Sequence, residues 1–207
     1  MRIGLLGGTF DPPHFGHLLA ASDAFEQLRL DRVVWIPAAQ QPLKTAGHAA
    51  TAADRLAMVQ LLTAGDARFS VDAIEIERAG LSFTVETLEA YSRMSPDDEL
   101  FLLLGTDVVR TFGKWKAPRR IGELARLAVL DRALENGASA GTVEKAAVLG
   151  AIRAVTGDDV PAPLVLDTRR VDLSSTEIRE RARAGRSLHG FVPDTVARYI
   201  GERALYR

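Results

Sequence analysis

Two glycines and two histidines near the start of the sequence could together bind a bulky anion. Gly7 and Gly8 follow an apolar run at residues 3–6, which predicts a buried strand, and His14 and His17 stand where a helical pattern begins. Glycines allow the backbone to turn sharply and approach an anion closely, and the free N–H groups at a helix start present partial positive charge to it. Because the imidazoles are three residues apart, both can face the same point.

A second group of polar residues lies near the other end of the sequence, at Leu173-Ser-Ser-Thr-Glu-Ile-Arg179. Hydroxyl groups ahead of a helical pattern are good helix caps, and Ser174 with Glu177 fits a capping box. Three hydroxyls, free backbone N–H groups and the guanidinium of Arg179 one turn later also form a cradle for an anion. Capping alone would explain the hydroxyls, and the cradle adds a role for the arginine.

Alternating strand and helix patterns must position these groups. Strands are expected at residues 3–6, 32–37, 69–76, 99–105, 127–130 and 164–166, and helices at 17–30, 51–65, 85–94, 121–124, 142–155, after 174 and from 194 to about 206. Thr84 is expected to cap the helix at 85–94. The run at 99–105 is the most hydrophobic and predicts a central strand, whereas the alternation at 69–76 predicts a strand near an edge.

The order strand, helix, strand favours parallel strands joined by right-handed crossovers. The loops that follow the strands then meet at one edge of the sheet, where ligands of open α/β sheets bind. Thr106 and Asp107 follow the central strand and are expected at this edge, although a role as helix cap would explain Asp107 equally well.

Composition limits the class of protein. With 207 residues, of which 47% are hydrophobic and 26% charged, a single domain spanning 1–207 is expected, with a helical C-terminal part at about 174–207. The formal net charge of −1 gives no overall basic field, so neither nucleic acid nor a membrane is expected as a partner. The absence of cysteine excludes disulfides and thiolate chemistry. With no signal peptide and no apolar run of about 20 residues, we expect a cytoplasmic protein, and the sequence leaves open whether it is a homo-oligomer.

The first motif, G-G-T-F-D-P-x-H-x-G-H, resembles the signature of the nucleotidyltransferase superfamily, and within it most resembles bacterial nicotinate-nucleotide adenylyltransferases. The segment at 173–179 is similar to the I-S-S-T-x-I-R motif of the same superfamily. The resemblance implies a Rossmann-like, doubly wound α/β fold with a mostly parallel sheet and helices on both faces. It also implies that the ATP phosphates contact Gly7, Gly8, Thr9, Phe10, His14, His17, Ser174, Ser175, Thr176 and Arg179.

The same resemblance implies a site for nicotinate mononucleotide. The segment S-F-T-V-E-T-L is similar to a family segment in which the backbone around Thr84 lines the nicotinate pocket, and Thr106, Asp107 and Trp115 match the family's G-x-D and F-x-x-W positions. An aromatic face next to the pyridine ring is physically sensible. Arg132 carries over from a segment that often reads Arg-Pro-Gly, although the turn residues that follow it differ here.

The implied reaction is adenylyl transfer from ATP to nicotinate mononucleotide, which gives deamido-NAD and pyrophosphate. His14, His17, Lys44 and Arg179 are the expected catalytic groups, although Leu43 replaces the histidine that usually precedes this lysine. Mg²⁺ is expected to arrive with ATP, so no protein metal site is expected. Three alternatives stay open: an adenylyltransferase acting on nicotinamide mononucleotide, one acting on phosphopantetheine, and a non-catalytic nucleotide sensor.

Overall fold

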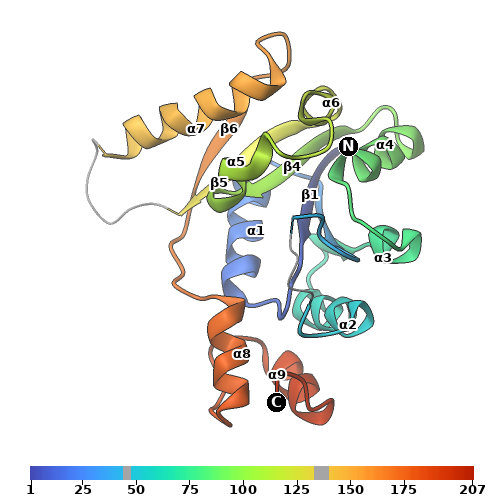
Figure 1. Cartoon of the computed structure of the whole chain (residues 1–207), viewed down its shortest axis with the longest axis vertical. Coiled ribbons are helices and arrows are strands. Elements are labelled where there is room, and N and C mark those ends of the chain that lie inside the picture. The colour runs from blue at the N-terminus through green and yellow to red at the C-terminus, as the bar shows by residue number, and fades with distance from the viewer. Residues whose placement is uncertain (44–47, 133–139) are drawn as a thin grey trace.

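A six-stranded sheet forms the centre of the computed structural model, which describes residues 1–43, 48–132 and 140–207 (Figure 1). Every strand pair is parallel, and the strand order is β3-β2-β1-β4-β5-β6. The strands are β1 (Arg2–Gly8), β2 (Arg32–Pro37), β3 (Phe69–Val71), β4 (Glu99–Gly105), β5 (Arg126–Arg132) and β6 (Leu164–Thr168). The expected central strand at 99–105 is therefore β4, beside β1 in the middle of the sheet, and the expected edge strand is β3.

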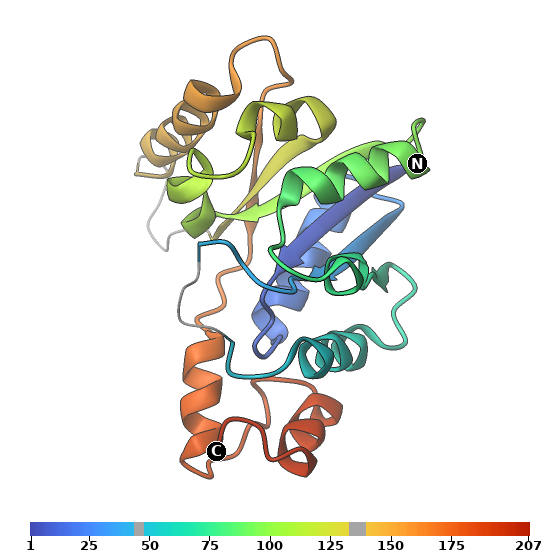
Figure 2. The same cartoon turned by 45° about the vertical axis from the view of Figure 1, so that its right-hand side comes forward.

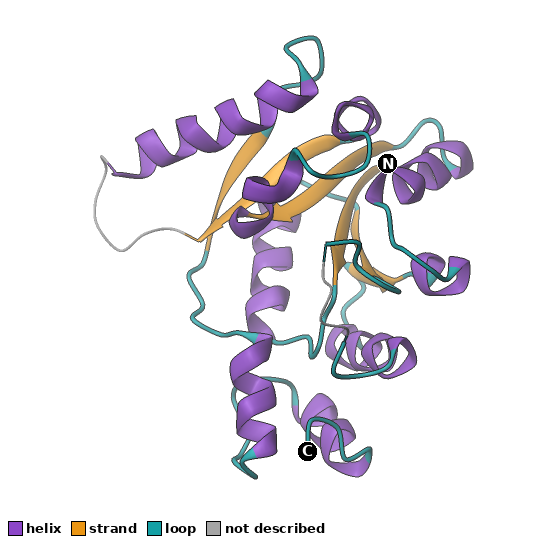
Figure 3. Cartoon of the chain, viewed as in Figure 1, coloured by secondary structure: helices purple, strands orange, loops and turns teal. Residues whose placement is uncertain are grey.

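Helices cover both faces of the sheet (Figure 3). They are α1 (Phe15–Gln27), α2 (Ala52–Thr63), α3 (Ile74–Arg78), α4 (Thr84–Met94), α5 (Thr106–Phe112), α6 (Pro118–Leu124), α7 (Ala140–Thr156), α8 (Ser175–Arg183) and α9 (Asp194–Glu202). Because successive strand residues point to opposite faces, each strand feeds two cores. Phe101 and Leu103 of β4 join the core under α1 and α2, whereas Leu102 and Leu104 join the core under α4, α5 and α6.

The last two helices, α8 and α9, lie beyond the sheet at one end of the molecule, next to α1 and α2 (Figure 2). Their apolar residues Ile178, Val196 and Ile200 are at most 3% exposed and belong to the same core as α1 and α2. Burial of each such side chain contributes about 1.5–3 kcal/mol. The core contacts therefore hold the start of α8 close to the loop that follows β1.

Three sequence predictions of local structure are wrong. The strand expected at 69–76 ends at Val71, because Oδ1 of Asp72 accepts a hydrogen bond from the amide of Ile74 at 2.9 Å and the short helix α3 begins there. Thr84 is the first residue of α4 rather than its cap, which is Phe83. The last helix ends at Glu202 rather than near Tyr206, because Ala204 and Tyr206 adopt positive φ angles of 50° and 67°.

Across the described ranges, no helix is both long enough and apolar enough to span a membrane.

Candidate active site

A cleft of about 640 Å³ opens at the carboxyl ends of β1 and β4. The chain order reverses between these strands, since β2 and β3 lie on one side of β1 and β4 to β6 on the other. Such a switch point leaves the crevice in which ligands of doubly wound sheets bind. The sequence-predicted residues that line the cleft are Gly7, Gly8, Thr9, Phe10, His17, Thr84, Asp107, Trp115 and Ser175.

The two histidines form a reciprocal cap at the start of α1. Nδ1 of His14 accepts a hydrogen bond from the Gly16 amide at 3.1 Å, and Nδ1 of His17 accepts one from the His14 amide at 3.3 Å. The ring centroids are 3.8 Å apart, and His14 is 2% exposed. Since Nδ1 accepts in both rings, a neutral imidazole carries its proton on Nε2. Gly16 leaves room for the His14 ring, because a Cβ at this position would lie 3.0 Å from it, a contact closer than most.

Gly8 and Phe10 shape the turn between β1 and α1. A Cβ on Gly8 would lie 2.8 Å from the Phe10 ring, so only glycine fits beneath it. Phe10 has a φ of 52° and packs edge-on to the His17 ring, with centroids 5.3 Å apart. The turn thus buries the phenylalanine and leaves the backbone of residues 7–9 along the cleft.

The two predicted anion motifs meet in space. Nη1 of Arg179 donates to the carbonyl oxygen of Asp11 at 2.7 Å, and Oγ of Ser175 donates to the carbonyl oxygen of Pro12 at 2.8 Å. Nη2 of Arg179 also donates to Oγ1 of Thr176 at 3.1 Å. Ser175 and Arg179 therefore both contact one loop, which lies more than 160 positions before them in the sequence.

Ser174 acts as the helix cap that the sequence predicts. Its Oγ accepts a hydrogen bond from the amide of Glu177 at 3.1 Å, and α8 starts at the next residue. Four described residues of the predicted ATP site stand outside the lining of the cleft, namely His14, Ser174, Thr176 and Arg179.

The other end of the cleft carries the predicted nicotinate residues. Trp115 packs against Phe112, with ring centroids 5.4 Å apart, and lines the cleft together with Thr84 and Asp107. Lys116 also lines it, and its Nζ lies 2.7 Å from Oε1 of Glu86.

Thr106, Arg132 and Lys44 complete the set of predicted site residues. Thr106 starts α5 without lining the cleft. Arg132 ends β5 in register with Thr168, and its side chain falls outside the described part of the chain. Lys44 also lies outside the described residues.

The profile of the cytidylyltransferase-like family matches residues 5–181, which include both anion motifs. A Gemmatimonas aurantiaca protein named "probable nicotinate-nucleotide adenylyltransferase" is 51% identical over 207 residues, which cover 100% of this chain and 93% of the relative. A Thermus thermophilus protein of the same name is 41% identical over 208 residues, with 100% of both chains covered. The chain belongs to the nicotinate-nucleotide adenylyltransferase family.

Two solved structures share the fold of this chain. The nicotinic acid mononucleotide adenylyltransferase of Plasmodium falciparum, complexed with NaAD, superposes with a TM-score of 0.75 at 14% identity and covers 99% of this chain and 97% of its own. The same protein complexed with APC gives a TM-score of 0.73 at 14% identity, with 99% and 96% covered. The expected Rossmann-like, doubly wound α/β fold is confirmed.

Two buried charged residues beside the cleft were not predicted from the sequence. Arg55 of α2 is 0% exposed, and its Nη1 and Nη2 donate to the carbonyl oxygens of Thr9 at 2.8 Å and Ala39 at 3.0 Å. This arginine joins the loops after β1 and β2. Burial lowers its pKa, while the nearby Asp11 carboxylate raises it. In the sequence, Arg55 is a charged residue within the apolar pattern of α2. Because charged residues in helices usually lie on a solvated face, this pattern does not by itself predict burial.

Glu75 is the second overlooked residue. It lines the cleft and is 7% exposed, and its Oε1 accepts a hydrogen bond from Oγ1 of Thr87 at 2.8 Å. Burial raises the pKa of this carboxyl, and the hydrogen bond from Thr87 opposes the shift. The alternation at residues 69–76 predicted a strand with one more solvated face, so the pattern concealed a buried carboxyl group.

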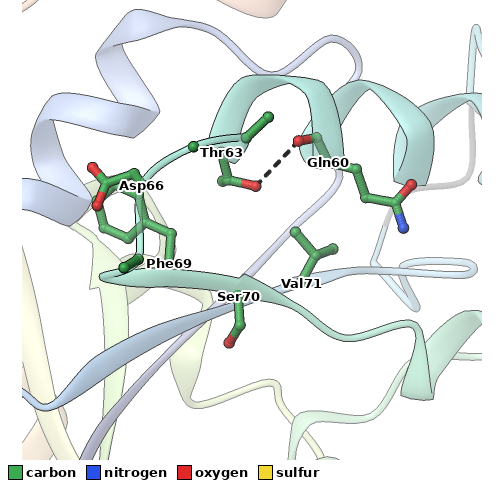
Figure 4. Close-up of a pocket in the computed structure, with 9 residues that line it drawn as sticks. Gln60, Thr63, Asp66, Phe69, Ser70 and Val71 are labelled. Carbon is green, nitrogen blue, oxygen red and sulfur yellow. Dashed lines mark hydrogen bonds between the residues drawn. The ribbon is translucent and has the colours of Figure 1, made fainter.

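A second hollow, of about 580 Å³, lies between the end of α2 and the edge strand β3 (Figure 4). Its polar groups include Thr63, whose Oγ1 donates to the carbonyl oxygens of Val59 at 3.0 Å and Gln60 at 3.4 Å. The hollow contains the turn that enters β3, whereas the cleft lies where strands end. Among the described residues, none that belongs to the two anion motifs lines this hollow.

Proposed function

We propose that this protein transfers the adenylyl group of ATP to nicotinate mononucleotide, forming deamido-NAD and pyrophosphate. The proposal rests on the contact between the two anion motifs, in which Arg179 and Ser175 bind the loop at residues 11–12 beside the cleft. The names of the relatives, at up to 51% identity over the whole chain, support the same reaction. The described elements then act together as one nucleotidyltransferase domain, which we place in the cytoplasm.

The reaction requires alignment and charge neutralisation rather than a protein nucleophile. A phosphate oxygen of nicotinate mononucleotide attacks the α-phosphorus of ATP, the bond to the bridging oxygen of the β-phosphate breaks, and pyrophosphate leaves with the electron pair. Preorganised donors aimed at the developing negative charge lower the barrier to such a step. We assign His14 to the α-phosphate and His17 to the β-phosphate, with Lys44 and Arg179 as further cations and the amides of Gly8, Thr9 and Phe10 as neutral donors.

We further propose that Mg²⁺ enters as part of the ATP substrate. This ion prefers oxygen ligands and usually keeps several waters and phosphate oxygens, so it needs few protein carboxylates. In the described chain, no group of three or more His, Cys, Asp or Glu side chains could hold a metal ion. The acceptor is assigned to the other end of the cleft, where Trp115 supplies an aromatic face for a pyridine ring.

An assay of pyrophosphate release tests the reaction. Purified protein and Mg-ATP are mixed separately with nicotinate mononucleotide, nicotinamide mononucleotide and phosphopantetheine, and we expect the highest kcat/KM with nicotinate mononucleotide. A preference for another acceptor would replace the proposed substrate. Binding of ATP without release for any acceptor would identify a nucleotide sensor instead.

His14→Ala tests the catalytic assignment. Loss of a donor to the transition state lowers kcat by about 10²–10³-fold, whereas loss of the helix cap costs only about 0.5–2 kcal/mol of stability. The control is His189→Ala, because the side chain of His189 is 82% exposed and contacts Asp194, which belongs to neither motif. Wild-type turnover in folded His14→Ala would refute the role of His14.

A further inference from the structure

The turn after α9 places a buried tyrosine against the loop that follows β1. The chain leaves the helix through hydrogen bonds from the amides of Ala204 and Leu205 to the carbonyl oxygens of Gly201 at 3.2 Å and Ile200 at 3.0 Å. Tyr206 is then 6% exposed. Its Oη donates a hydrogen bond of 2.7 Å to Oδ1 of Asp11.

Asp11 joins this tyrosine to the phosphate-binding loop. Its carboxylate also accepts the amides of Ala49 at 2.8 Å and Ala50 at 3.2 Å, and it is 6% exposed. The carbonyl oxygen of the same residue accepts the guanidinium of Arg179. Asp11 thus makes contacts with three separate parts of the chain through one side chain and one peptide group.

We propose that Tyr206 is a positioning residue for adenylyl transfer, which holds Asp11 so that its carbonyl oxygen keeps Arg179 in place at the ATP phosphates. This inference rests on the proposed function. Tyr206 itself does not line the cleft, so it acts through Asp11 and not by touching a substrate.

Because Asp11 is buried, its hydrogen bond from Tyr206 affects the geometry of the loop that follows β1. A buried carboxylate that loses a donor has an acceptor oxygen without a partner, and water reaches it poorly. Its free energy falls if it moves toward other donors. The guanidinium of Arg55 is such a donor, since it is close enough to Asp11 for their charges to interact. Movement of the Asp11 side chain would shift its peptide group and with it the acceptor of Arg179.

The helix before this turn, α9, supplies a matched control. Oη of Tyr199 in α9 donates a hydrogen bond of 2.9 Å to Oδ1 of Asp54 in α2. Asp54 is 4% exposed, so this is also a bond between a tyrosine and a buried aspartate across the interface of α2 and α9. Unlike Asp11, Asp54 belongs to neither anion motif.

The experiment compares Tyr206→Phe with Tyr199→Phe in the full chain, by pyrophosphate release and by thermal unfolding. Each variant loses one hydroxyl and keeps its ring, so similar losses of stability are expected. We expect Tyr206→Phe to lower kcat/KM for ATP by about tenfold, the effect of losing one hydrogen bond to a charged group. KM for nicotinate mononucleotide should stay within about twofold of wild type, because the acceptor occupies the other end of the cleft. Tyr199→Phe should leave both kinetic constants unchanged.

Two outcomes with an active wild-type protein would overturn the positioning role and leave the proposed function intact. In the first, the two variants change kcat/KM for ATP equally. In the second, Tyr206→Phe has the same kinetic constants as the wild type. Absence of pyrophosphate release by the wild type would overturn the proposed function instead. In that case calorimetric titration with a non-hydrolysable ATP analogue still tests the inference. Affinity about tenfold weaker in Tyr206→Phe alone supports it, and equal affinity in all three proteins refutes it.

Discussion

Nδ1 of His14 and Nδ1 of His17 both accept backbone hydrogen bonds, so each ring has a fixed orientation before any ligand binds. Fixed donors cost no reorganisation when charge develops in a transition state, which is the main way in which a protein can stabilise it. The tight stacking of the two rings and the burial of His14 add to this rigidity. Substitution of Gly16 would disturb both, since its missing side chain makes room for the His14 ring.

Glu75 gives a pH dependence of stability at the scale of a single residue. Burial raises its pKa in the folded protein above the value of about 4.3 in the unfolded chain. Its contribution to the free energy of unfolding is therefore fully present below about pH 4 and is lost as pH rises through the folded pKa. Glu75→Gln should become more stable relative to wild type as pH increases from about 4 to 7, as measured by urea unfolding.

Glu202→Gln is the control for this prediction, because Glu202 is exposed at the end of α9. Its free energy of unfolding relative to wild type should change little over the same pH range. A Glu75→Gln variant whose relative stability is flat or falls as pH rises would contradict the burial of a charge at this position.

At the scale of elements, the start of α8 and the loop before α1 form one unit. The side chains of Ser175 and Arg179 reach across to carbonyl oxygens of that loop, and the neighbouring Ile178 is buried in the core. Since residues i, i+3 and i+4 lie on one side of a helix, α8 faces the loop with the side that carries these three residues. The free N–H groups of its first turn then point toward the place where an anion would bind.

Arg179→Lys tests this unit. The guanidinium bonds both the Asp11 carbonyl and the Thr176 hydroxyl, and a single ammonium group cannot reproduce that fork. We expect KM for ATP to rise by about tenfold or more, as measured in the pyrophosphate assay. Arg183→Lys, an exposed position of the same helix, should behave as wild type. Unchanged constants in Arg179→Lys would show that α8 positions nothing at the ATP site.

At the scale of the whole molecule, the proposed ATP site combines segments from both ends of the sequence. The loop after β1 belongs to the centre of the sheet, whereas α8 and α9 lie beyond it (Figure 1). A ligand that contacts both parts binds only when they are assembled. Such a ligand stabilises the native state by linkage.

A non-hydrolysable ATP analogue with Mg²⁺ should therefore raise the melting temperature. At about 100 times its Kd, the analogue adds about 2.7 kcal/mol to the free energy of unfolding, which corresponds to roughly 5–10 °C for a chain of this size. Inorganic phosphate at the same concentration is the control and should give a much smaller shift. No shift with the analogue at saturation would contradict a nucleotide site between these segments.

The sequence by itself determined the order of the strands and of the longer helices, the central place of residues 99–105 and the two anion motifs. These features depend on local signals, namely apolar runs, glycine turns and capping hydroxyls, each of which spans only a few neighbouring residues. The fold class follows from them because strands that alternate with helices have few ways to pack.

Only the tertiary structure decided which polar groups are buried together. The bonds from Tyr206 to Asp11 and from Arg55 to the Thr9 carbonyl join residues far apart in the sequence, and nothing in the local pattern distinguishes these side chains from solvated ones. The local pattern did not predict the burial of Glu75 either. Its alternating neighbours favoured a strand, whereas in the structure the Asp72 side chain accepts a hydrogen bond from the Ile74 amide and a helix begins there. Burial and partnership depend on contacts between distant segments, which the folded chain alone brings together.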